Sequence, residues 1–137
     1  MDEALLAAYR DTDYRVRLTR GGWATIRIDQ PLPSALRPMA GPHPWAFITA
    51  WNPRSEPTPR PQNRAAMRSL LEALRAAPGT VVIRPGLGSG SAWAEPSLWV
   101  VGLDTTVIDA FAQRFRQFGY VHGQGPAPAQ LRLTPLI

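Results

Sequence analysis

The sequence predicts an α+β fold in which helices pack on one antiparallel sheet as a two-layer sandwich. From residue 45 onward the apolar patterns follow the order strand, helix, strand, strand, helix, strand, which predicts a ferredoxin-like βαββαβ core over residues 45–123. The two most apolar runs, 45–51 and 97–103, fall on the inner strands of that arrangement, as burial on both faces requires. A length of 137 residues suits a single domain, 1–137.

An N-terminal helix and a β-hairpin precede this core. Residues 2–11 place leucine and tyrosine side chains at helical spacing behind acidic residues, which favours a short amphipathic helix. Residues 14–18 and 24–28 alternate apolar and polar side chains around a pair of glycines, which predicts a hairpin. Matching of the buried faces favours a three-residue loop that places Leu18 opposite Ala24. The position at which the hairpin joins the sheet stays open.

The middle of the chain begins with a proline-rich segment. Residues 30–44 contain five prolines, which remove backbone donors, so we expect a loop that is neither helix nor strand. The run 45–51 then predicts a central strand. Methionine and leucine at helical spacing predict a helix over 62–77, with Asn63 as its N-cap and a Pro-Gly pair as its end. The run 80–84 predicts a short edge strand.

The last third of the chain alternates loops with regular elements. Residues 85–96 are rich in glycine and predict a loop before the strand 97–103. A helix follows, which we expect Asp104 or Thr105 to cap and Gly119 to end. Two short strands are expected after it, an edge strand at 120–122 and a further strand at 130–134.

The composition restricts the classes of function. All fifteen basic residues are Arg and the formal net charge is +5, which suits a nucleic acid or another polyanion, although the codon bias of a GC-rich bacterial genome produces the same composition. The absence of Cys excludes disulfides, thiolate nucleophiles and zinc–thiolate sites. His43 and His122 lack the spacing of a metal-ligand pair, so we expect no metal and no cofactor.

The sequence also bears on location. No run approaches the ~18 apolar residues that a membrane span needs, and the N-terminus opens with acidic residues where a signal peptide is basic. We therefore expect a cytoplasmic bacterial protein with no membrane partner. The oligomeric state does not follow from the sequence.

A candidate site follows from the predicted topology. The carboxyl end of strand 45–51 and the amino end of antiparallel strand 97–103 meet at one rim of the sheet, beside the start of helix 62–77. The segments 52–55 and 93–97 therefore converge there. The candidate ligand-binding residues are Asn52, Arg54, Ser55, Asn63, Arg64, Trp93, Glu95 and Ser97.

These residue types favour a small anionic ligand or an acidic peptide end. The helix start presents unpaired N–H groups and the positive end of its dipole, and Arg54 and Arg64 could neutralise an anion there. Asn52, Ser55 and Asn63 could orient it. A structural role is equally open for Asn52 and Ser55, because both residue types satisfy backbone donors in turns.

An enzyme is the second hypothesis for this rim. Burial beside Trp93 could raise the pKa of Glu95 and make it a general acid or base, with Ser97 or Asn52 positioning a substrate. Glu95 could instead cap the loop through backbone N–H groups or pair with Arg64. Whether the protein is an enzyme therefore stays open.

Single-stranded RNA is a third, less favoured partner. Ferredoxin-like sheets can stack unpaired bases on aromatic side chains of their open face. The candidate rings are Trp45, Phe47, Trp51 and Trp99, and the candidate phosphate contacts are Arg15, Arg17 and Arg27. We favour the alternative that the N-terminal elements cover these rings as part of the core.

Three short motifs suggest a relationship. They are Thr49-Ala50-Trp51-Asn52-Pro53-Arg54-Ser55, then Asn63 opening a helix, then Trp93, Glu95 and Ser97 before a strand. In this order and spacing they resemble the bacterial family called domain of unknown function 3293, over roughly residues 5 to 123. A further family element matches in part at Phe115-Arg116-Gln117, where Arg replaces the usual Gly. The resemblance implies no activity.

Overall fold

The computed structural model describes residues 3–135. Its helices are α1 (Glu3–Asp11), α2 (Arg37–Ala40), α3 (Arg60–Ala76) and α4 (Thr105–Arg114), with short 3₁₀ turns at Ser34–Leu36 and Pro53–Ser55. Its strands are β1 (Asp13–Arg17), β2 (Trp23–Ile26), β3 (Pro44–Ile48), β4 (Val82–Ser89), β5 (Ala94–Val101), β6 (Gly119–Gln124) and β7 (Gln130–Leu133). The mixture confirms the predicted α+β class.

The strands form one antiparallel sheet in the order β2-β1-β4-β5-β3-β6-β7 within the described residues. The two apolar inner strands are neighbours, and Trp45 of β3 stands opposite Val101 of β5. Strands β4 and β6 were predicted at the edges, and that prediction is wrong. Strand β1 of the hairpin pairs with β4, and β7 pairs with β6. The sheet therefore extends beyond β4 on one side and beyond β6 on the other.

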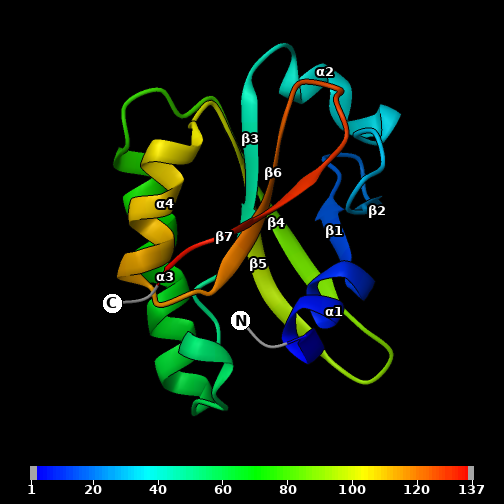
Figure 1. Ribbon diagram of the computed structural model, residues 1–137. Helices are drawn as coiled ribbons and strands as arrows, with labels where there is room; N and C mark the ends of the chain where they lie inside the picture. Colours follow the sequence, from blue (N-terminus) through cyan, green and yellow to red (C-terminus); the bar gives the residue numbers. More distant parts are fainter. Residues whose placement is uncertain (1–2, 136–137) are drawn as a thin grey trace.

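Helices α3 and α4 lie side by side on one face of the sheet (Figure 1). Their apolar stripes pack on the strand residues that point to that face, because side chains alternate along a strand. Leu70 and Leu74 of α3 and Ile108 of α4 are buried there against Ile48 and Val100.

The opposite face is enclosed by the sheet itself, which curls. Backbone bridges at Ile28–Ala129 and Pro31–Pro128 join the segment after β2 to the segment before β7. Trp45 and Trp99 lie inside this curl, 1% and 0% exposed. They pack with apolar residues of the hairpin and of the proline-rich segment, as the covered-core alternative predicted.

The hairpin register differs from the prediction by two residues. Val16, not Leu18, stands opposite Ala24. The turn is closed by one hydrogen bond from the Leu18 N–H to the Gly22 carbonyl and another from the Gly21 N–H to the Leu18 carbonyl. The φ angle of Gly22, +80°, suits this earlier turn. A shift of two residues keeps every side chain on its predicted face, so face matching could not distinguish the two registers.

The segment predicted as a glycine-rich loop is largely strand. β4 runs to Ser89 and β5 starts at Ala94, with a tight turn between them that a Gly90 N–H to Trp93 C=O hydrogen bond closes. Gly86 serves packing within β4, because a Cβ there would stand 2.8 Å from the Phe47 ring.

Three helix predictions also need correction. The proline-rich segment contains α2, which accommodates Pro38 in its first turn, where a missing N–H costs little. Asn63 is not the N-cap of α3; Pro59 holds that position, and Asn63 turns its side chain inward. Helix α4 ends before Arg116, which adopts φ +56°, and Gly119 starts β6. The Asp104 cap is confirmed, since its carboxylate accepts from the Val107 N–H at 3.2 Å.

None of the helices among the described residues is both long enough and apolar enough to span a membrane. The same residues contain no group of three His, Cys, Asp or Glu side chains arranged for a metal ion.

Candidate functional site

A cavity of about 310 Å³ opens at the end of the sheet where β3 finishes and β5 begins. The sheet contributes Phe47, Gly88 and Ser97 to its wall, and the loop after β3 contributes Trp51 and Asn52. Helix α1, drawn in blue at this end of the sheet in Figure 1, covers the cavity. We call it the sheet-end cavity.

Three hydrogen bonds hold helix α1 over the sheet-end cavity. Two are accepted by its backbone carbonyls, and one is donated by the side chain of its tyrosine, Tyr9. The Tyr14 hydroxyl of β1 donates to the Tyr9 carbonyl at 2.6 Å, and the Thr12 hydroxyl donates to the Ala8 carbonyl at 2.5 Å. The Tyr9 hydroxyl reaches across to the Gly119 carbonyl of β6 at 3.4 Å. The three side chains line the cavity, so these contacts define its α1 wall.

The loop after β3 is fastened by two asparagines. Asn63, 1% exposed, accepts from the Asn52 N–H at 2.8 Å and donates to the Asn52 side-chain oxygen at 2.8 Å and to the Thr58 carbonyl at 3.1 Å. The Thr58 N–H donates to the same Asn52 oxygen. Asn52 therefore holds the turn together, as its structural interpretation predicted, while it also lines the sheet-end cavity.

Left-handed backbone conformations concentrate in this loop. Asn52, Arg54 and Ser55 have φ of +47°, +57° and +59°, a region that non-glycine residues rarely occupy. The Arg54 N–H donates to the Arg116 carbonyl at 2.7 Å, and the Gln117 amide donates to the Trp51 carbonyl at 3.3 Å. Contacts from the end of α4 thus keep a strained loop in place beside the cavity.

Glu95 places a carboxylate in the sheet-end cavity. Its side chain is half-buried, and burial raises its pKa. No hydrogen bond or ion pair engages that carboxylate among residues 3–135, although the three ion pairs of the described chain show that arginine partners occur elsewhere. Apart from tyrosines, Glu95 is the one ionisable residue among the described residues that line the cavity.

Glu95 acts on the neighbouring tyrosines. Burial and the negative charge of Glu95 raise the pKa of Tyr9 to about 12. Burial, and to a smaller degree Tyr9 and Glu95, also raise the pKa of Tyr14. Both phenols therefore keep their protons at neutral pH, and the charge of Glu95 reaches α1 and β1 across the cavity.

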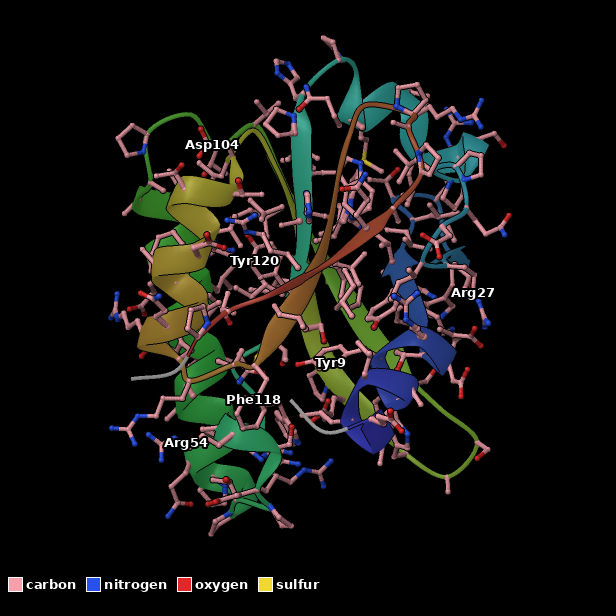
Figure 2. All side chains as sticks on the ribbon, in the orientation of Figure 1. Tyr9, Arg27, Arg54, Asp104, Phe118 and Tyr120 are labelled. Atoms are coloured by element: carbon pink, nitrogen blue, oxygen red, sulfur yellow. The ribbon has the colours of Figure 1, made fainter. Side chains whose placement is uncertain are left out.

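The structure separates the predicted site residues into two groups. Asn52, Ser55, Trp93, Glu95 and Ser97 line the sheet-end cavity together. The other three predicted residues, Arg54, Asn63 and Arg64, do not line it. Arg54 and Arg64 are exposed, and Figure 2 shows Arg54 at the α3 side of this end of the molecule, apart from Tyr9 on α1. Asn63 is enclosed within the loop.

Sequence reasoning missed several cavity residues. Tyr9, Tyr14 and Gln117 line the cavity, and the first two belong to elements whose place in the fold was not predicted. Gln117 lies in the partly matching family element Phe115-Arg116-Gln117, which was a usable signal. Of the rings considered for base stacking, Trp51 and Phe47 line the cavity. Phe47 is only 4% exposed, and Trp45 and Trp99 are at most 1% exposed.

The protein thus has an α+β fold with a partly enclosed cavity at one end of its sheet. Residues 48–118, more than half of the chain, match the family described as "Protein of unknown function (DUF3293)". The chain belongs to this family. No curated protein and no solved structure matches it. The matched region includes the loop after β3, the amino end of β5 and Gln117, but neither α1 nor the hairpin.

Proposed function

We propose that this protein binds a small organic molecule in the sheet-end cavity. The observation that carries the proposal is the Glu95 carboxylate, which is half-buried without a partner among the described residues inside a cavity of about 310 Å³. A buried charge without a partner costs free energy, so natural proteins keep one mainly where a ligand or a reaction uses it. Aromatic walls with a few polar groups are typical of such sites.

The anionic ligand expected from the sequence has less support. Arg54 and Arg64, which were expected to neutralise it, do not line the cavity, and the charged side chain that does is an acid. An anion or an acidic peptide end would have to bind outside the cavity, beside the exposed start of α3.

A cavity-filling variant tests ligand binding. Titration of ¹⁵N-labelled protein with small aromatic fragments is expected to shift the backbone amides around Asn52 and Glu95 and the indole N–H of Trp93. Ala8→Trp places an indole into the cavity from α1 and is expected to abolish these shifts. Ala7→Trp, on the same exposed helix but outside the cavity lining, is the matched control and keeps them. Shifts that survive Ala8→Trp would overturn the proposal.

A proton-transfer enzyme is the second candidate. The raised pKa of Glu95 favours it, because a carboxyl group that titrates closer to neutral pH is a better general acid or base. In D₂O, a bound fragment that carries a C–H next to a carbonyl group is expected to exchange that proton for deuterium, as seen by NMR. Glu95→Gln should abolish that exchange while binding persists; exchange that continues unchanged rules the enzyme out.

Single-stranded RNA finds little support as a partner. Trp45 and Trp99 are buried and offer no face to a base, and Phe47 is only 4% exposed. Binding that falls steeply with salt would revive this hypothesis, because phosphate contacts release counterions.

We also propose that β3, β4, β5 and β6 with α3 and α4 form a ferredoxin-like core. The order β4-β5-β3-β6 with antiparallel neighbours, and a helix in each of the two crossovers, support this. Superposition of an experimental structure on ferredoxin-like domains tests it. A bacterial, cytoplasmic setting stays a prediction.

A further inference from the structure

We propose that the molecule bound in the sheet-end cavity carries an organic ammonium group, held between the Glu95 carboxylate and the aromatic rings around it. This inference rests on the proposed function and names the chemical class of its ligand. It reverses the charge expected from the sequence.

The charged side chain inside the cavity is an acid. The chain has fifteen arginines and a net charge of +5, yet none of them lines the cavity that contains Glu95. Asp13, Asp29 and Asp109 each pair with an arginine, so the fold supplies guanidinium partners at several places. A cation from outside the chain would form the corresponding ion pair with the Glu95 carboxylate.

The cavity also has an aromatic wall. Tyr9, Tyr14, Trp51 and Trp93 line the same cavity as Glu95. The faces of such rings carry partial negative charge and attract organic cations. Three arginine–ring contacts occur among the described residues, over Trp23 and Phe115, and none uses a ring of this cavity.

The charge of Glu95 also acts on its neighbours in the cavity. Burial raises the pKa of Tyr9 and Tyr14, and the negative charge of Glu95 adds to that rise at both phenols. An ammonium group there would interact favourably with the carboxylate, whereas a second anion would be repelled. The volume of about 310 Å³ admits a small aliphatic or aromatic amine.

Three probes of nearly equal shape and different charge test the inference. They are benzylammonium, benzyl alcohol and benzoate, titrated separately into ¹⁵N-labelled protein at pH 7. We expect benzylammonium to bind at least about tenfold more tightly than benzyl alcohol, with shifts centred on Trp93 and Glu95, and benzoate to bind more weakly than either.

Two variants assign the preference to Glu95. Glu95→Gln keeps the shape and removes the charge, and it is expected to bring benzylammonium to the affinity of benzyl alcohol, whose binding it leaves in place. Glu56→Gln removes an exposed acid outside the cavity lining and is expected to change nothing. Thermal unfolding of each variant verifies that it is folded.

Different outcomes of these titrations contradict different parts of the proposal. If the three probes bind equally well at the cavity, or benzoate binds best, the ammonium inference is overturned and the proposed binding function stands. If the ammonium preference survives in Glu95→Gln, the assignment to Glu95 is overturned. If none of the probes shifts a cavity resonance, the inference and the proposed function fail together.

Discussion

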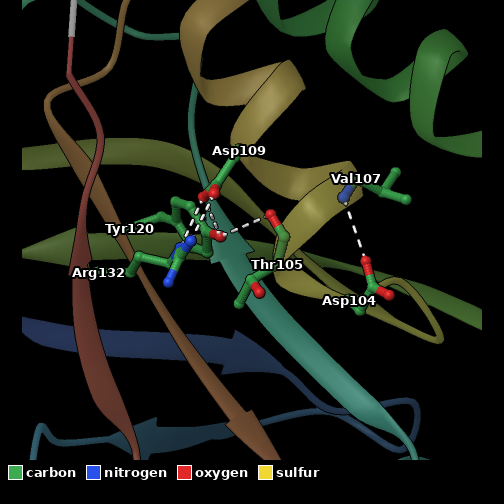
Figure 3. A network of polar contacts seen from close by, with 6 residues as sticks. All are labelled: Asp104, Thr105, Val107, Asp109, Tyr120 and Arg132. Carbon is green, nitrogen blue, oxygen red and sulfur yellow. Dashed lines mark hydrogen bonds and ion pairs between the residues drawn. The ribbon is translucent and has the colours of Figure 1, made fainter.

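Two carboxylates of this protein, Asp109 and Glu95, differ in their hydrogen-bond partners and in the direction in which the fold changes their pKa. Asp109 of α4 accepts from Arg132 Nε at 2.8 Å and Nη2 at 2.7 Å and from the Tyr120 hydroxyl at 2.7 Å (Figure 3). The hydrogen bond from Arg132 is the main reason that the pKa of Asp109 lies below its usual range. Glu95, at the sheet-end cavity, has no such partner among residues 3–135, and burial raises its pKa.

Only one of these two carboxylates contributes to the stability of the fold through its contacts. The Asp109 cluster joins α4 to β6 and β7, so its contacts connect a helix to the edge of the sheet. Glu95 connects no elements through its carboxylate. The carboxylate of Asp109 therefore supports the packing of α4 on the sheet, whereas the carboxylate of Glu95 makes no such contact.

The largest expected effect comes from the paired polar groups beside the cavity. Asn63→Ala removes three hydrogen bonds from a residue that is 1% exposed and leaves the Asn52 N–H without its acceptor. We expect the free energy of unfolding to fall by about 2–3 kcal/mol, measured by urea denaturation. Gln62→Ala, at an exposed position of the same helix turn, serves as the control. Equal stability of the two variants would contradict the structural role of Asn63.

The fold class and one strand pairing could be predicted from the sequence, whereas the role of Asn63 could not. The α+β class and the pairing of β3 with β5 followed from two continuous apolar runs, because such runs are buried on both faces. The same pairing brings Asn52 and Glu95 to one cavity. Asn63 was predicted as an N-cap facing a ligand, but a polar residue near a helix start can equally bond to a preceding loop, and here it does.

The α1 wall could not be predicted. Alternation in the hairpin determines which side chains share a face and says nothing about the neighbouring strand, so its place beside β4 was open. Tyr9 and Tyr14 reach the cavity only through that placement. The course of the loop at Arg54 likewise includes left-handed residues, Asn52, Arg54 and Ser55, that the sequence does not specify.

An intermediate effect is expected at the paired carboxylate. Tyr120→Phe removes the hydroxyl that donates to Asp109, from a side chain that is 2% exposed. We expect a loss of about 1 kcal/mol in the free energy of unfolding, the usual contribution of one hydrogen bond. The variant is also expected to lose less stability than the parent on acidification, because part of the stabilisation of ionised Asp109 is gone. Unchanged stability at pH 7 would show that the Tyr120 hydroxyl in the cluster of Figure 3 contributes nothing to stability.

The smallest effect, opposite in sign, is expected at Glu95. The folded protein holds the Glu95 proton more tightly than the unfolded chain does, since burial raises its pKa. Its contribution to stability is therefore complete below about pH 4.3, the ordinary glutamate value, and is lost as pH rises through the higher folded value. For Asp109 the pKa is lowered, so its contribution is present above the ordinary aspartate range and is lost as pH falls through the folded value.

Substitution of Glu95 should accordingly stabilise the empty protein at neutral pH. We expect Glu95→Gln to raise the free energy of unfolding at pH 7 by less than about 1 kcal/mol and to leave it almost unchanged at pH 4. Glu56→Gln, at an exposed position, should show neither effect. Urea denaturation at the two pH values measures the difference. A loss of stability in Glu95→Gln at pH 7 would mean that the carboxylate does stabilise the fold, and the contrast with Asp109 would then disappear.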